Sequence, residues 1–168
     1  MILEPFQRWS FWEMRIAVVS DIHGNRTAFE AVLADLRQTS PDVVLHGGDL
    51  ADTGSSPAET VDCIRSLGWQ GVVGNTDQML PLPETFEEFA NQSPKLQSPW
   101  AVLREMAAAT REALGKERLA WLRSLPLTQI HARIALVHAS PENPRGAAQA
   151  DLTLDFYEVS DKSSVTAQ

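Results

Sequence analysis

The sequence predicts an α/β fold built on a mostly parallel sheet. Short apolar runs rich in β-branched residues alternate with amphipathic helical patterns, and each run ends in a polar loop rich in Gly, Asp and Asn. Strands that alternate with helices in this way form a parallel sheet whose faces are covered. The length of 168 residues and the hydrophobic content of 43% suit one domain with a substantial core.

The first predicted strand covers residues 15–20 and ends in a polar loop that contains Asp21 and His23. Apolar residues then recur at helical spacing over residues 27–37, which predicts an amphipathic helix packed on that strand. The i, i+2 spacing of the two polar residues places both side chains on one side of an extended segment. Both could therefore reach one ion.

The second predicted strand covers residues 42–46, and its polar loop, residues 47–52, contains Asp49. A helix follows, with Ser56 as N-cap, Pro57 in the first turn, Glu59 completing a capping box, and Gly68 as the terminator. Residues 71–73 form a third predicted strand, followed by a loop at 74–77. Right-handed crossovers place all three loops at one edge of the sheet, where open α/β sheets bind ligands.

The rest of the chain is less regular. Residues 80–99 predict an irregular excursion or a short helix, and a helix from Ser98 and Pro99 then runs close to Gly115. A further helix is predicted over residues 117–125 and a fourth strand over residues 134–137, which ends at His138. From residue 142 onward the pattern is weak, with order expected only around residues 152–157.

Four strand ends thus deliver an oxygen and imidazole set suited to divalent metals. Each Asp or Asn taken alone is more often a turn residue or a helix cap, and each His is more often a structural residue. Taken together, the set favours ligation, because caps do not require histidines at two of the same ends. The set consists of Asp21, His23, Asp49, Asn75 and His138.

At these positions the chain resembles the calcineurin-like metallophosphoesterases, whose motifs run D-x-H, G-D-x-x-D, G-N-H-D/E, a histidine, and G-H-x-H. The match covers residues 14–141, and the family's α/β sandwich is the expected fold. The corresponding segments here are Asp21-Ile22-His23, Gly48-Asp49-Leu50-Ala51-Asp52, Gly74-Asn75-Thr76-Asp77 and Val137-His138-Ala139-Ser140-Pro141.

The resemblance implies two divalent metal ions, of Mn, Fe, Ni or Zn. Asp21, His23 and Asp49 would bind the first ion, and Asp49 would bridge to a second ion. Asn75, the expected catalytic residue, and His138 would hold the second. The implied reaction is hydrolysis of a small phosphorylated substrate by a metal-bridging hydroxide.

Two acidic residues complete the implied site. Asp52 and Asp77 would orient ligands or waters. For both residues a loop carboxylate or a helix cap is an equally good interpretation.

Two departures from the family pattern narrow the function. Thr53 and Gly54 stand where protein phosphatases of this superfamily have the Arg-Gly pair that binds phosphate, which argues against a protein phosphatase. Thr76 replaces the histidine assigned as leaving-group acid, and a hydroxyl is too weak an acid for that role. The small prokaryotic phosphodiesterase branch tolerates this change and favours substrates with acidic leaving groups.

No Gly-His-x-His follows His138 in this sequence, so the second sheet is expected to be incomplete and the chain to be truncated before that motif. Residues 1–13 are interpreted as an N-terminal extension, residues 14–141 as the metallophosphoesterase domain, and residues 142–168 as an irregular C-terminal segment. A non-catalytic scaffold or an inactive remnant is therefore the alternative function. Hydrolysis of dinucleoside polyphosphates is a third option.

Composition limits the partners. The net charge of −8 argues against extended nucleic-acid binding, and no apolar run is long enough to predict a membrane span. The single cysteine, Cys63, excludes an internal disulfide and favours a reducing, cytoplasmic environment. Cys63, His46 and His131 are interpreted as structural or incidental. An uncovered sheet edge would favour a homo-oligomer.

Overall fold

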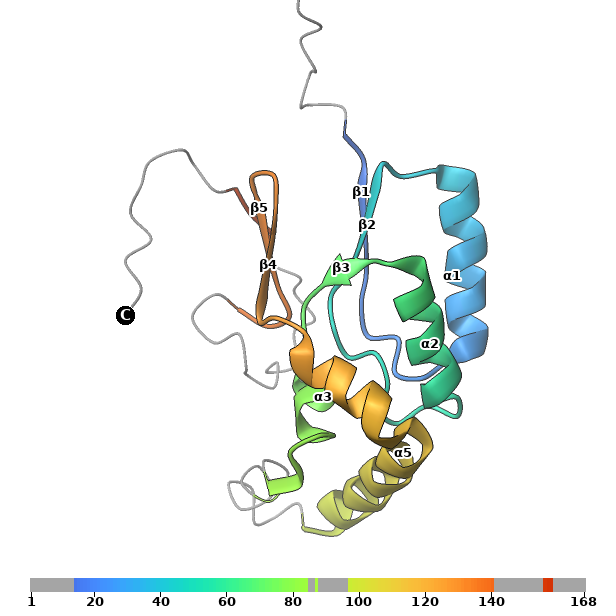
Figure 1. Ribbon diagram of the computed structural model, residues 1–168, viewed down its shortest axis with the longest axis vertical. Helices are drawn as coiled ribbons and strands as arrows, with labels where there is room; N and C mark the ends of the chain where they lie inside the picture. Colours follow the sequence, from blue (N-terminus) through green and yellow to red (C-terminus); the bar gives the residue numbers. More distant parts are fainter. Residues whose placement is uncertain (1–13, 85–86, 88–96, 141–155, 159–168) are drawn as a thin grey trace, which may run out of the picture.

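The computed structural model describes residues 14–84, 87, 97–140 and 156–158 and has the predicted α/β fold (Figure 1). Helices α1 and α2 lie on one side of a parallel three-stranded sheet, and a small antiparallel sheet lies on its other side. The predicted N-terminal extension, residues 1–13, lies outside the described residues, as does most of the predicted C-terminal segment.

The parallel sheet contains β1 (Ile16–Val19), β2 (Val43–His46) and β3 (Gln70–Gly71), in that spatial order. The parallel pairing confirms the prediction, with Ile16 opposite Val43 and Leu45 opposite Gln70. The third strand was expected at residues 71–73 and is shorter, because the chain leaves the ladder early. The Val72 N–H still donates to the His46 carbonyl at 3.0 Å, whereas the Val73 N–H donates to the carbonyl of Pro126 at 2.9 Å.

The antiparallel sheet contains β4 (Thr128–His131), β5 (Ile134–Val137) and β6 (Phe156–Glu158). The fourth predicted strand is confirmed as β5, but it pairs with β4 and β6 and not with the parallel sheet. Sequence reasoning missed β4, whose alternating burial leaves Ile130 62% exposed and so gives no continuous apolar run. Strand β6 lies in the C-terminal segment and overlaps residues 152–157, where the sequence predicted some order.

The first two helices match their predictions closely. Helix α1 covers Arg26–Thr39, and its N-cap residue Asn25 accepts a hydrogen bond from the Ala28 N–H. Helix α2 covers Pro57–Leu67 and ends at Gly68, which adopts a left-handed conformation with φ of 66°. The predicted capping box is wrong, because the Ser56 side chain makes no capping hydrogen bond.

The later helices differ more from expectation. Helix α3 (Asn75–Met79) forms where a loop was predicted, and Gly74 caps it. Helix α5 (Gln97–Ser124) is interrupted at Gly115, whose φ of 65° and ψ of 175° are not helical, so the two predicted helices are confirmed as its two parts. The predicted excursion at residues 80–99 falls largely outside the described residues.

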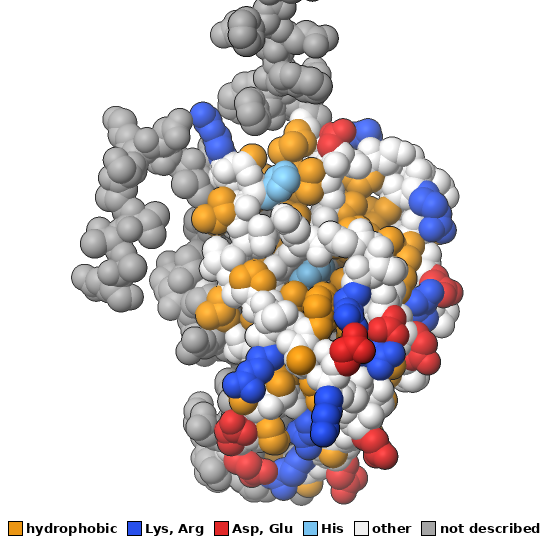
Figure 2. Space-filling view, viewed as in Figure 1, with side chains coloured by type: hydrophobic (Ala, Val, Ile, Leu, Met, Phe, Trp, Pro, Cys, Tyr) orange, Lys and Arg blue, Asp and Glu red, His pale blue; other side chains and the backbone are white. Residues whose placement is uncertain are grey.

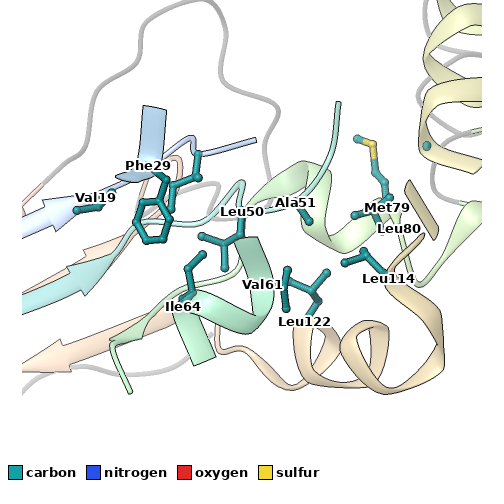
Figure 3. Packing of buried hydrophobic residues seen from close by; sticks show 12 residues of the cluster. Val19, Phe29, Leu50, Ala51, Val61, Ile64, Met79, Leu80, Leu114 and Leu122 are labelled. Atoms are coloured by element: carbon teal, nitrogen blue, oxygen red, sulfur yellow. The ribbon is translucent and has the colours of Figure 1, made fainter. Parts of the chain in front are cut away.

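Apolar residues pack on both faces of the parallel sheet, as the alternation of side chains along a strand requires. The larger cluster lies between the sheet and the helices, and Figure 3 shows Phe29 of α1, Ile64 of α2 and Leu122 of α5 meeting there. On the opposite face, Leu45 and Val72 pack against Leu136 of β5. The two sheets and the helical layer therefore form one continuous scaffold for the loops at the strand ends.

The surface shows no segregation of charge on the face drawn in Figure 2, where acidic and basic side chains alternate over the helical half. Two ion pairs between such side chains join α2 to α5. Arg118 lies 2.6 Å from Asp62, and Arg65 lies 2.9 Å from Glu117. Among the described residues, no helix is both long enough and apolar enough to span a bilayer.

Candidate metal centre

The loops after β1 and β2 are joined to each other by backbone hydrogen bonds at the carboxyl edge of the parallel sheet. The Asp21 N–H donates to the Gly48 carbonyl at 3.0 Å, and the His23 N–H donates to the Asp49 carbonyl at 2.9 Å. These bonds fix the spacing of two loops that come from separate strands. The side chains of Asp21, His23 and Asp49 therefore project from one rigid backbone assembly.

Three of the predicted ligands have strained backbones. Asp21, His23 and Asp49 adopt positive φ angles of 57°, 49° and 54°, a left-handed conformation that is uncommon for residues with a side chain. Such strain costs of order 1–3 kcal/mol per residue and persists at functional sites, where the surrounding structure enforces it. The chain thus bears a conformational cost at the predicted ligands.

Glycines allow the β2 and β3 loops to approach closely. A Cβ atom on Gly74 would collide with the backbone nitrogen and the carboxylate of Asp49, and a Cβ on Gly48 would collide with the backbone of Gly74. The Thr76 N–H donates to Asp49 Oδ1 at 3.0 Å across this contact. The bond holds one carboxylate oxygen and leaves Oδ2 directed elsewhere.

The first donor group contains Asp21, His23 and Asp49, each of which offers one ligand atom within 4.8 Å of the other two. His23 Nε2 lies 3.8 Å from Asp21 Oδ1 and 3.7 Å from Asp49 Oδ2. His23 Nδ1 lies 3.1 Å from the Asp52 carbonyl. A carbonyl oxygen can only accept, so Nδ1 is the donor in this contact and Nε2 is the ring nitrogen that faces the carboxylates.

The second donor group contains Asp49, Asn75 and His138. His138 Nδ1 lies 2.7 Å from the Gly47 carbonyl, to which it donates, and Nε2 is the ring nitrogen turned toward the other two donors. That nitrogen lies 3.0 Å from Asn75 Oδ1 and 3.6 Å from Asp49 Oδ2. Asp49 Oδ2 is therefore nearly equidistant from the two histidine nitrogens and lies between the two groups.

The chemistry of the donor set fits cations. In both groups an imidazole Nε2 faces oxygens of carboxylate or amide side chains, and nitrogen and oxygen donors of these kinds are ligands for divalent cations. Two donors about 2.1 Å from one ion lie up to about 4.2 Å apart, and the separations of 3.6–3.8 Å fall within this limit. The site could hold two divalent ions, with Asp49 shared between them.

Asp77 supports the loop that carries Asp49. Its fully buried carboxylate accepts hydrogen bonds from the backbone N–H groups of Leu50 at 2.9 Å, Ala51 at 3.3 Å and Gly74 at 3.3 Å. Burial, and then the charge of Asp49, raise the pKa of Asp77 to about 7. Asp77 therefore joins the β2 and β3 loops through their amides.

Asp52 acts differently from the prediction based on its carboxylate. Its main-chain carbonyl contacts the His23 ring, whereas its side chain accepts from the Thr53 N–H at 2.9 Å and interacts with the Thr110 hydroxyl. Burial raises the pKa of this carboxyl group. Asp52 therefore orients His23 through its backbone, an effect that residue type alone could not reveal.

The remaining polar residues fall outside the two donor groups. The Thr76 hydroxyl oxygen is buried and has no hydrogen-bond partner among the described residues. His46 is fully buried in β2 next to the Trp121 ring, and burial lowers the pKa of His46 to about 4. His131 lies in β4, and Cys63 is half-buried in α2.

Comparison with known proteins identifies the family of the chain. The sequence model of the family described as calcineurin-like phosphoesterase matches residues 14–161. An uncharacterized protein of Methanocaldococcus jannaschii is 32% identical over 133 residues, which are 77% of this chain and 51% of that protein. The crystal structure of a metallophosphoesterase from Sphaerobacter thermophilus superposes with a TM-score of 0.63 and 32% identity, over 80% of this chain and 51% of that one. The chain thus spans about half the length of both relatives.

Proposed function

The chain belongs to the calcineurin-like phosphoesterase family, and we propose that it acts in a metal-dependent phosphoesterase of the phosphodiesterase type. The observation that carries the proposal is the position of Asp49 Oδ2, which lies 3.7 Å from His23 Nε2 and 3.6 Å from His138 Nε2. A carboxylate oxygen that lies close to an imidazole nitrogen of each donor group could be shared by a pair of adjacent cations.

In this proposal the chain's own residues build and align the site. Asp21 and His23 hold one ion, Asn75 and His138 hold the other, and Asp49 is common to both. The carbonyls of Asp52 and Gly47 fix the ring orientation of the two histidines. When bound, two divalent cations would supply positive charge for the phosphoryl oxygens and would acidify a water molecule.

The substrate class follows from the charge and from position 76. The chain carries a net charge of −8, so the positive charge that a phosphate needs would come from the ions. The buried Thr76 hydroxyl offers no acid for a leaving group at this position. We therefore expect small phosphodiesters whose leaving groups are already acidic, such as nitrophenyl esters, to be the best substrates.

The test is hydrolysis of bis(p-nitrophenyl) phosphate in the presence of manganese. The wild-type chain should release nitrophenol, and Asp49→Asn should abolish the release because the shared donor loses its charge. Asp35→Asn is the matched control, since Asp35 is an exposed carboxylate on α1, and it should keep full activity. Absence of manganese-dependent hydrolysis by the wild type, or equal rates in the two variants, would reject the proposal.

A non-catalytic scaffold is the second candidate, and Thr76 is the observation that favours it, because the family's acid histidine is replaced by a hydroxyl that is buried. A scaffold would bind its partner equally well in EDTA and in manganese, and Asp49→Asn would not weaken that binding. Hydrolysis that disappears in Asp49→Asn would reject the scaffold.

A further inference from the structure

A cavity of about 250 Å³ lies beside the candidate metal centre, between the loop at residues 53–57 and helix α5. None of the five predicted metal ligands lines it. Its lining consists of Thr53, Gly54, Ser55, Pro57, Met106, Ala109, Thr110 and Ala113. The cavity is therefore distinct from the two donor groups, although two of its lining residues, Thr53 and Thr110, contact the Asp52 carboxyl group.

The wall of this cavity is attached directly to the metal centre. Gly54 packs so closely against the backbone of His23 and Gly24 that a Cβ atom at position 54 would overlap the His23 carbonyl oxygen. The Ser56 N–H donates to the Gly24 carbonyl at 3.0 Å, which anchors the loop at its other end. A single segment of backbone therefore separates the cavity from His23, one of the predicted metal ligands.

The lining carries no charged side chain, so it offers no positive charge for a phosphate group. Thr53 and Ser55 are exposed and provide hydroxyl groups on the loop side, whereas the Thr110 hydroxyl interacts with the Asp52 carboxyl group. Met106, Ala109 and Ala113 provide an apolar wall on α5, and Met106 is 37% exposed. An apolar wall with hydroxyl groups on the opposite side suits a planar ring that has hydrogen-bonding substituents.

We propose that this cavity binds the uncharged, ring-bearing organic group of the phosphate ester that the metal centre hydrolyses. The proposal rests on the proposed function. Typical small-molecule sites have volumes of about 300–1,000 Å³, so a cavity of about 250 Å³ holds one ring of a substrate and not the whole molecule. Met106 supplies the polarizable thioether that packs favourably against aromatic rings.

Filling the cavity tests the proposal. Ala109→Phe places a ring within it, and Ala108→Phe is the matched control, because Ala108 is an exposed neighbour on the same helix that does not line the cavity. We expect Ala109→Phe to raise KM for bis(p-nitrophenyl) phosphate by about tenfold or more, equivalent to about 1.4 kcal/mol of lost binding, with kcat nearly unchanged. Ala108→Phe should leave both constants unchanged. Ala113→Phe should repeat the effect of Ala109→Phe.

A second readout does not depend on activity. The methyl resonance of Met106, in protein labelled with carbon-13 at the methionine methyl groups, should shift when p-nitrophenyl phosphate is titrated in EDTA, and Ala109→Phe should suppress the shift. If this shift occurs while the wild type hydrolyses nothing in manganese, the proposed function fails and the cavity assignment stands. Equal KM values in the Phe variants at 108 and 109, or an unperturbed Met106 methyl, would overturn the cavity assignment.

Discussion

Replacing Asp77 tests how the β2 and β3 loops are held together. In Asp77→Ala, the buried N–H groups of Leu50, Ala51 and Gly74 lose their acceptor. Each unsatisfied buried donor costs about 1–3 kcal/mol. Two effects offset part of the cost of the three donors: water can enter the space, and a buried carboxylate is removed. We therefore expect the free energy of unfolding to fall by about 3 kcal/mol. Urea denaturation followed by circular dichroism measures it.

The Asn and Ala variants separate packing from hydrogen bonding. Asp77→Asn keeps one acceptor oxygen at the same volume, so its loss should be smaller than that of Asp77→Ala. Asp35→Ala removes an exposed carboxylate on α1 and should change stability by less than about 0.5 kcal/mol. A loss below about 1 kcal/mol in Asp77→Ala would refute the reasoning, because three buried amides would then have found other partners without cost.

Three further predictions concern packing, pH and surface charge. Gly74→Ala should weaken manganese binding at least about tenfold in calorimetry, because its Cβ overlaps Asp49. The pKa of His46 is about 4 in the folded chain and near 6.5 when unfolded, so the unfolded state alone gains a proton between these values. The contribution of His46 to stability should be complete above pH 6.5 and about 3 kcal/mol smaller towards pH 4, measured as the difference between the wild type and His46→Leu by urea titration at each pH, because the raised pKa of Asp77 acts in the opposite direction in both chains. Arg118→Ala removes an exposed ion pair with Asp62 and should lower stability by about 1 kcal/mol or less in the same assay.

Each of these predictions has a control. Gly68→Ala also changes a loop glycine, but no atom lies within 4 Å of its Cβ position, so manganese affinity should be kept. A stability difference between the wild type and His46→Leu that stays the same from pH 6.5 to pH 4 would assign the proton uptake to other groups. A loss of several kcal/mol in Arg118→Ala would mean that this surface pair is more than an exposed contact.

Sequence patterns predicted the parts of the fold that depend on local chemistry. The apolar runs of β1, β2 and β5 are continuous, and the terminators Gly68 and Gly115 adopt the positive φ angles that glycine favours. Strand β4 was missed because Ile130 faces outward and its neighbours are polar, so its pairing with β5 decides its conformation. Long-range pairing of this kind leaves little trace in a short segment.

The candidate site was predictable by residue type but not by role. The Asp-x-His motif and the strand-end positions identified the donor residues. The contacts that orient these residues, in contrast, involve backbone atoms far apart in the sequence. The Asp52 carbonyl on His23, the Gly47 carbonyl on His138 and the amides on Asp77 depend on how the loops fold against each other. No pattern in a single sequence reports a main-chain acceptor 91 residues from the ring it orients.

The most direct test of the account is manganese titration by isothermal calorimetry on the folded chain. We predict saturable binding of two ions per chain, loss of both in Asp49→Ala because the shared oxygen is removed, and loss of one in His138→Ala. Absence of binding heat in the wild type, or unchanged binding in Asp49→Ala, would contradict the claim that these five side chains form a paired cation site.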